Sequence, residues 1–234
     1  MDRKCSSSGS HINEMKNSDL KFRPIDKLEK KIFSDKEFLT AIKIGKPRKS
    51  HDEGTIKMHI IQILGYIDKN YYKTAQYEDL RIIALLHDIG KFAFLEESPD
   101  LFIPNLSENK CKKIIEECRK FRKKYYTQKD VPKNMRKYSL TEKHANVSYQ
   151  FAKKFLKDKK LLELIRYHDL ATDIRWEYED TKKYDAKIFK KIFTHIDLRL
   201  YLAFLKCDNC NRVDGTSQWL KTQLDFNKIY IMAR

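Results

Sequence analysis

Five segments with helical periodicity each place one histidine or aspartate on their apolar face: His59, His87, His144, His168 and Asp208. A single histidine in such a position is more often a hydrogen-bonded core residue than a metal ligand. Five in separate helices would leave several buried polar groups without partners, which is costly. A shared metal ion satisfies all of them, because imidazole and carboxylate together suit divalent transition metals. The sequence therefore predicts a metal site inside a helical core.

The dipeptide His87–Asp88 follows directly on an apolar helical stretch. Adjacent residues of a helix point about 100° apart, so both side chains reach one ion only where the helix ends. Gly90 predicts such an end, because glycine tolerates the backbone conformations of a helix stop. We therefore expect His87 and Asp88 to bind the same cation, with Lys91 placed to meet an anion beside it.

The elements that must position these residues are predicted to be almost entirely helical. The chain has only 6 glycines and 5 prolines, and few stretches alternate in the manner of strands. We expect one or two short helices over residues 26–45. One helix is expected in each of six further segments: 55–70, 77–88, 107–126, 141–156, 159–170 and 196–213. The predicted fold class is all-α, a helical bundle with a metal site in its centre.

The chain of 234 residues is long enough for one sizeable domain with an extension. Its Ser-rich start, residues 1–20, predicts a flexible tail, and residues 21–234 predict a single domain. A basic helical insertion is expected around residues 97–138, between two groups of helices.

The chain carries 49 Lys and Arg against 33 Asp and Glu, a formal net charge of +16. Such an excess favours polyanionic partners through counterion release, so we expect a nucleotide or nucleic-acid substrate. The alternative is a solvated basic surface that only aids solubility. The predicted substrate-binding side chains are Lys91, Lys112, Lys113, Arg119, Lys120, Arg122, Lys123 and Arg212.

Membrane proteins and disulfide-rich secreted proteins do not fit this sequence. No apolar run approaches the roughly 18 residues that a membrane span needs, and the start lacks the apolar region of a signal peptide. Of the five cysteines, Cys207 and Cys210 form one C-x-x-C, but no second pair completes a zinc site and no βαβ pattern supports a redox motif. We expect reduced thiols in a cytoplasmic protein with no membrane partner.

Taken in order, these motifs resemble the HD-domain phosphohydrolase superfamily. A His-Asp pair alone carries no weight, but the ordered set, which runs from about Gly45 to Gly215, is specific. The matching stretches are His59, "LLHDIGK" at 85–91, "EKHANVSYQFAKKF" from 142, "LIRYHD" from 164 and "FLKCDNCNRVDG" from 204. "HDEGTIKMH" at 51–59 and "KCDNCNR" at 206–212 look most like the HD module of tRNA nucleotidyltransferases and poly(A) polymerases, although Asp52 stands where proline is usual.

The resemblance implies an HD-domain helical bundle with a role for each matching residue. The residues that match the first metal site are His59, His87, Asp88 and Asp208. His144 and His168 match positions that hold a second metal in binuclear members or otherwise touch the scissile phosphate. Lys91 matches a residue that often assists phosphate chemistry.

Neighbouring residues leave alternatives open. In another register Asp197, in "FTHIDLRL" with His195, could be the last acid, although the residues around Asp208 match the family ending better. Residues 51–53 open the motif without an assigned role. We interpret Asp169 as the exposed neighbour of a ligand, and His11 as a residue of the tail.

The implied reaction is hydrolysis of a phosphoester. The ligands suit one or two divalent ions of Mn, Fe, Co, Ni or Zn, with Mg as a further option. We expect Asp88, Lys91, His144 and His168 to be catalytic, by orienting a water or by stabilising charge on phosphoryl oxygens. The expected substrate is a 2′,3′-cyclic phosphate, a terminal phosphate or a phosphodiester of a nucleotide or nucleic acid. The alternatives are a nucleoside-triphosphate phosphohydrolase and a catalytically silent nucleotide- or nucleic-acid-binding module.

Overall fold

The computed structural model describes residues 23–45, 54–96, 108–126, 141–170, 194 and 196–210. Within these ranges every regular element is a helix, apart from one isolated bridge between Gly45 and Thr55. The prediction of an all-α fold is confirmed. The elements are α1 (Lys27–Ser34), α2 (Lys36–Ala41), α3 (Ile56–Asn70), α4 (Tyr77–Leu86), the 3₁₀ helix η1 (Ile89–Phe94), α5 (Glu108–Tyr125), α6 (Thr141–Ala152), α7 (Lys159–Arg166) and α10 (Leu198–Asp208).

Short polar side chains fix where several of these helices begin. Asp26 and Asp35 accept hydrogen bonds from the first-turn backbone N–H groups of α1 and α2. Thr55 caps α3, Asp158 caps α7 and Asp197 caps α10 in the same way. Each such cap stabilises its helix by about 1 kcal/mol, because it satisfies N–H groups that have no partner inside the helix.

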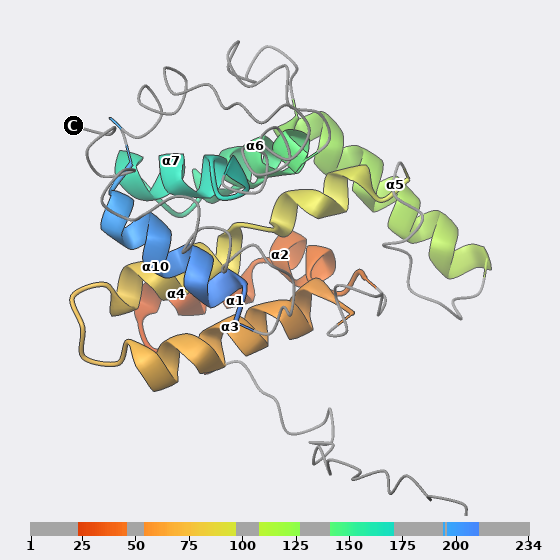
Figure 1. Cartoon of the computed structure of the whole chain (residues 1–234). Helices are drawn as coiled ribbons and strands as arrows, with labels where there is room; N and C mark the ends of the chain where they lie inside the picture. Colours follow the sequence, from red (N-terminus) through yellow and green to blue (C-terminus); the bar gives the residue numbers. More distant parts are fainter. Residues whose placement is uncertain are drawn as a thin grey trace, which may run out of the picture.

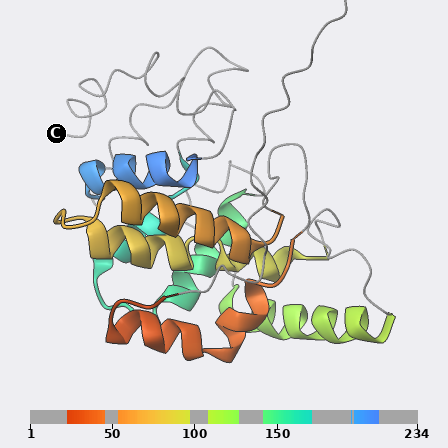
Figure 2. The ribbon, with the colours of Figure 1, turned by 90° about the horizontal axis from the view of Figure 1, so that it is seen from below.

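The helices pack in two groups around α4 (Figures 1 and 2). Helices α3, α4 and α10 lie side by side, while α6 and α7 pack against each other and against α4. The 3₁₀ helix η1 lies between α4 and α6. Helix α5 packs against η1 and α6, and both views show that it extends outward from one side of the bundle.

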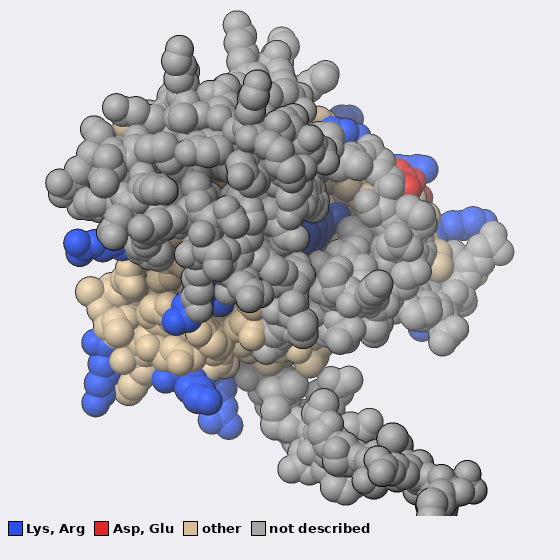
Figure 3. Space-filling view, in the orientation of Figure 1, with Lys and Arg blue, Asp and Glu red and all other residues tan. Residues whose placement is uncertain are grey.

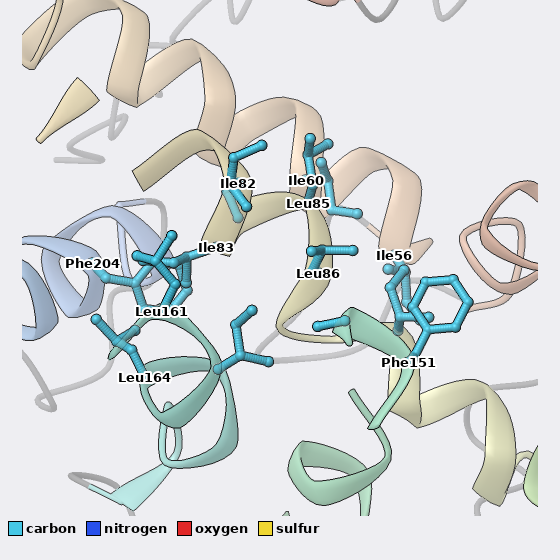
Figure 4. Packing of buried hydrophobic residues seen from close by; sticks show 14 of the residues in the cluster. Ile56, Ile60, Ile82, Ile83, Leu85, Leu86, Phe151, Leu161, Leu164 and Phe204 are labelled. Carbon is cyan, nitrogen blue, oxygen red and sulfur yellow. The ribbon is translucent and has the colours of Figure 1, made fainter. Parts of the chain in front are cut away.

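The core lies between the apolar faces of these helices (Figure 4). Ile60, Ile83, Leu86, Phe151 and Phe204 come from α3, α4, α6 and α10, and each is fully buried. Burial of one such side chain stabilises the fold by about 1.5–3 kcal/mol. The same faces carry the histidines of the predicted site, so the packing that forms the core also brings these histidines together.

A second buried feature, a cluster of charged side chains, ties α1 to α4. Arg81, which is 2% exposed, donates from Nε to Oε1 of Glu29 at 2.7 Å and from Nη2 to Oε2 at 3.1 Å. Its Nη1 donates to Asp68 of α3. Sequence periodicity gave no sign of this cluster, because the partners of Arg81 lie on two other helices, α1 and α3.

Helix α4 ends in a different way from that predicted. Its last residue is Leu86, and the chain tightens through His87 and Asp88 into η1. Gly90 is not a helix stop with positive φ. Its role is close packing, since a Cβ there would lie 1.9 Å from the carbonyl oxygen of His144. The Gly90 N–H donates to Ser148 Oγ at 2.8 Å, which holds η1 against α6.

The other predicted boundaries hold with small differences. The segment 26–45 forms two helices, and the helices expected over 141–156 and 159–170 end earlier, at Ala152 and Arg166. Helix α5 lies within the predicted insertion of residues 97–138. The predicted tail, residues 1–20, lies outside the described residues, and no disulfide joins the four cysteines that the structure describes.

Candidate metal centre

The structure brings six of the predicted residues into two adjacent groups of potential metal ligands. Within each group, one ligand atom per residue lies within 4.8 Å of the others. The first group comprises His59 of α3, His87 after α4 and Asp208 at the end of α10. The second comprises Asp88, His144 of α6 and His168 after α7. Residues that are up to 149 positions apart in the sequence therefore meet in one site.

In the first group, the carboxylate of Asp208 faces both imidazoles. Its Oδ1 lies 2.9 Å from His59 Nε2 and 3.4 Å from His87 Nε2. Both histidines are buried, with exposed fractions of 6% and 1%. The predicted choice of Asp208 over Asp197 agrees with this geometry, since the Asp197 carboxylate caps α10 instead.

His87 carries the clearest sign that this group is built to bind a cation. Its Nδ1 lies 3.0 Å from the carbonyl oxygen of Ala84, which only accepts, so Nδ1 is the protonated nitrogen. In the neutral ring, Nε2 then carries a lone pair. This atom is buried and has no hydrogen-bond partner. A buried polar atom without a partner is rare in proteins, and a bound cation would satisfy both this lone pair and the two carboxylates that face it.

In the second group, two imidazoles face each other directly. Nε2 of His144 and Nε2 of His168 lie 3.2 Å apart. His168 Nδ1 donates to the carbonyl oxygen of Ile165 at 2.8 Å, which again directs Nε2 into the cluster. Burial lowers the pKa of both rings. The pKa of His144 stays below its ordinary value. The pKa of His168 is instead raised to about 9, because the nearby carboxylates of Asp169 and Asp88 outweigh the effect of burial.

Asp88 joins the two groups through its two carboxylate oxygens. Oδ2 lies 3.5 Å from His87 Nε2 and 3.7 Å from His59 Nε2. Oδ1 lies 3.4 Å from His144 Nε2 and 3.5 Å from His168 Nε2. A carboxylate in this position can bridge two cations.

The charge of Asp88 is maintained by its surroundings although it is only 3% exposed. Burial would raise the pKa of its carboxyl group, but Lys91, the neighbouring histidines and their hydrogen bonds hold it well below the ordinary value. Lys91 lies one turn further along η1, and its Nζ lies 2.5 Å from Asp88 Oδ2. The Lys91 side chain is 21% exposed, so it connects the buried carboxylate with the surface.

These residues fit divalent transition-metal ions. Each group offers two imidazole nitrogens and at least one carboxylate oxygen, the donor set that such ions prefer. Neighbouring donors on a tetrahedron with arms of about 2.1 Å lie about 3.4 Å apart. The distances from Asp208 and Asp88 to the histidine nitrogens, 2.9–3.7 Å, are close to this spacing.

Asp169 was wrongly interpreted as an exposed neighbour of His168. Its side chain is 24% exposed, and Oδ2 lies 3.2 Å from His144 Nε2 and 3.5 Å from His168 Nε2. Helix α7 ends at Arg166, so Asp169 does not continue the helical rotation away from His168. The sequence signal that could have found it is a second His-Asp pair after a helix end, which matches His87–Asp88.

The basic residues of α5 have mixed environments. Arg119 pairs with Glu96, and the guanidinium of Arg122 lies over the rings of Phe94 and Tyr126. On the face shown in Figure 3, the described Lys and Arg side chains lie at several separate places, including the side that α5 occupies. Four predicted substrate-binding lysines of α5 are exposed: Lys112, Lys113, Lys120 and Lys123. Arg212, His195 and residues 51–53 lie outside the described ranges.

Comparison with protein families gives this arrangement a class. The family model for the HD domain matches residues 58–197, which is more than half of the chain. The chain therefore belongs to the HD-domain family, whose members are generally metal-dependent hydrolases that bind divalent metals. No curated protein and no solved structure matches the chain.

The family match does not reach all of the residues in the two ligand groups. The matched range ends at residue 197, before Asp208, yet it is Asp208 that lies beside His59 and His87. In the part of the chain that the structure describes, no helix combines the length and apolar character needed to cross a membrane.

Proposed function

We propose that this protein is a phosphohydrolase that uses two divalent cations bridged by Asp88. The observation that carries the proposal is the orientation of the Asp88 carboxylate. One of its oxygens faces the His59 group and the other faces the His144 group. In a site with one ion, His144 and His168 would instead contact the scissile phosphate directly, but the approach of Asp88 Oδ1 to both rings favours a second ion between them.

The surrounding side chains support hydrolysis of a phosphoester. Divalent cations in such a site lower the pKa of a bound water and polarise a phosphoryl oxygen. Asp88 can in addition accept a hydrogen bond from the attacking water, because its carboxylate stays ionised. Lys91 contacts Asp88 directly, and its partial exposure allows its ammonium group to donate to an incoming phosphate.

A nucleotide or nucleic-acid phosphoester is the substrate that the charge favours. The net charge of +16 attracts polyanions, and four lysines of α5 are exposed to solvent. The likeness of "HDEGTIKMH" and "KCDNCNR" to the HD module of tRNA nucleotidyltransferases and poly(A) polymerases remains a prediction that points the same way. The location of the protein in the cytoplasm is likewise a prediction.

A panel of phosphoesters tests the proposal. Protein loaded with Mn²⁺, Co²⁺, Zn²⁺ or Mg²⁺ would be assayed with p-nitrophenyl phosphate, bis-p-nitrophenyl phosphate, cyclic nucleotides, 3′-phosphorylated oligonucleotides and nucleoside triphosphates. We expect hydrolysis of an ester of a nucleotide or oligonucleotide that stops when the metal is removed with a chelator. Hydrolysis of triphosphates alone would identify the alternative enzyme. Bound metal without hydrolysis of any ester would identify a silent binding module and overturn the proposal.

A further inference from the structure

A carboxylate that was not among the predicted ligands, Asp169, lies beside the second ligand group of Asp88, His144 and His168. Asp169 Oδ2 lies 3.2 Å from His144 Nε2 and 3.5 Å from His168 Nε2. On the same two nitrogens, Asp88 Oδ1 approaches to 3.4 and 3.5 Å, and the nitrogens themselves are 3.2 Å apart. All of these distances therefore lie between 3.2 and 3.5 Å. Donors on a tetrahedron with arms of about 2.1 Å would be about 3.4 Å apart.

We propose that Asp169 is a ligand of the second cation, together with Asp88, His144 and His168. This inference rests on the proposed function, because it assumes that the second group holds an ion. It adds a fourth donor to that ion and assigns Asp169 a role in metal binding.

Local structure holds Asp169 where this role requires it. The turn after α7 is fixed by a hydrogen bond from His168 Nδ1 to the carbonyl oxygen of Ile165 at 2.8 Å. Tyr201 of α10 donates from its hydroxyl group to the carbonyl oxygen of His168 at 3.4 Å. These contacts fix the backbone immediately before Asp169, so that its carboxylate extends over the pair of imidazoles.

The charge of the site also favours a carboxylate at this position. Without Asp169, the second cation would face one carboxylate, Asp88, which it would share with the first cation. With Asp169, each group has one carboxylate of its own in addition to the shared Asp88. Two divalent cations and three carboxylates then leave one net positive charge, and Lys91 adds another. A site of this charge still attracts a phosphate anion, while the repulsion between the two cations is reduced.

The test compares Asp169→Asn with the control variant Glu163→Gln. Glu163 lies on α7, its side chain is also 24% exposed, and it pairs with Arg166 on the helix surface. Each protein would be stripped of metal, incubated with Mn²⁺ or Co²⁺, and freed of excess ion, and bound metal per chain would be counted by mass spectrometry. We expect two ions in the wild type and in Glu163→Gln, and one in Asp169→Asn, with circular dichroism unchanged.

The outcomes separate this inference from the proposed function. Two ions in folded Asp169→Asn would overturn the role of Asp169 and leave the proposed function intact. No ion in the folded wild type would overturn both. If Asp169→Asn does not fold, crystals of the wild type grown with Mn²⁺ give the answer through anomalous scattering. A second peak within about 2.2 Å of Asp169 Oδ2 would support the inference, and a second peak more than about 3 Å away would overturn it.

Discussion

Two buried clusters of charged and polar side chains include residues of α4 or of the turn that follows it, and they differ in whether their polar groups are paired within the protein. Around Arg81, the guanidinium donates to Glu29 and Asp68, so positive and negative groups are in direct contact. Around Asp88, imidazole nitrogens face one another and face carboxylates, and Nε2 of His87 has no partner. In the first cluster, the charges are balanced by other protein side chains. In the second cluster, we expect bound cations to satisfy the facing nitrogens and carboxylates.

This difference separates a structural role from a functional one. A buried ion pair in direct contact adds specificity to the packing, and removal of one partner is costly because a charge is left unpaired. A buried group of facing lone pairs costs stability until a ligand binds it, which proteins accept at functional sites. Substitutions in the Asp88 cluster should therefore have their largest effect on activity, and substitutions in the Arg81 cluster should have theirs on stability.

The largest effect on activity is expected for Asp88→Asn. An amide keeps the shape of the side chain but cannot supply the bridging charge, so metal binding and hydrolysis should both be lost. We expect a fall of about 10³-fold or more in kcat/KM, equivalent to about 4 kcal/mol. The metal-free variant should unfold at a lower temperature than the metal-free wild type, because the contacts with Lys91 and the histidines that hold the pKa of Asp88 low also stabilise the folded state.

Asp79→Asn provides the control for this variant, because Asp79 lies in the first turn of α4, away from the ligand groups. It should leave activity and metal content unchanged. Activity of Asp88→Asn equal to that of the wild type would show that Asp88 does not belong to a metal site.

The largest effect on stability is expected for Arg81→Met. This substitution leaves the buried Glu29 carboxylate without its ion-pair partner and should lower the free energy of unfolding by about 3–5 kcal/mol. Denaturation in urea measures the decrease. The double variant Arg81→Met, Glu29→Leu removes both charges and should recover much of the stability. If the double variant is no more stable than the single one, the unpaired charge is not the cause, and the contrast between the clusters fails.

A smaller effect concerns the exposed lysines of α5. If they contact a polyanion, Gln in place of Lys112, Lys113, Lys120 and Lys123 should weaken binding of a 3′-phosphorylated oligonucleotide. The slope of log affinity against log salt should become shallower by about 0.7–0.9 for each phosphate that the variant no longer neutralises. Hydrolysis of p-nitrophenyl phosphate, which is too small to reach these lysines from the metal site, should not change.

The matched control for α5 replaces four exposed lysines elsewhere: Lys27, Lys30, Lys69 and Lys160. The control protein loses the same net charge, so it measures the general effect of charge on affinity. Equal salt slopes for the two variants would mean that α5 is only a solvated basic helix. That outcome would remove the main support for a nucleic-acid substrate and leave the metal site unaffected.

The smallest effect is expected for the partly exposed cluster that anchors α5 to α2 and α6. Glu37 accepts hydrogen bonds from Lys124, Lys154 and Tyr125. Burial raises the pKa of Glu37, but these partners outweigh it and lower the pKa from 4.5 to about 2. A lowered pKa stabilises the fold above pH 4.5, and this contribution disappears as pH falls towards 2.

Glu37→Gln should therefore cost about 1 kcal/mol at neutral pH, since a partly exposed ion pair contributes little. The difference in unfolding free energy between wild type and variant should narrow between about pH 5 and pH 2. A difference that stays constant over this range would show that the Glu37 charge is not what anchors α5.

Much of the candidate site could be predicted because His59, His144 and Asp208 lie on separate helices, while His87 and His168 continue the apolar periodicity of two others just beyond their ends. That pattern identified His59, His144 and His168 without any knowledge of how the helices pack. The pair His87–Asp88 was found through the rule that neighbours converge where a helix ends. The same rule applies to His168–Asp169, but the expected helix extended to residue 170, and so Asp169 was missed.

Other features depend on packing and could not be read from the sequence. The close contact of Gly90 with α6 exists only when η1 and α6 meet, so the glycine alone suggested a helix stop. The partners of Arg81 lie on two other helices, and no local pattern connects them. The bridging position of Asp88 likewise depends on how the helices that carry the histidines are spaced.

The number of metal ions bound by the folded wild-type chain tests the central claim most directly. Protein stripped with a chelator would be reloaded with Mn²⁺ or Co²⁺, freed of excess ion and analysed by mass spectrometry, with circular dichroism to verify the fold. The account predicts two ions per chain, one in each ligand group, and neither of them in Asp88→Asn. A folded wild-type chain that retains one ion or none would contradict it.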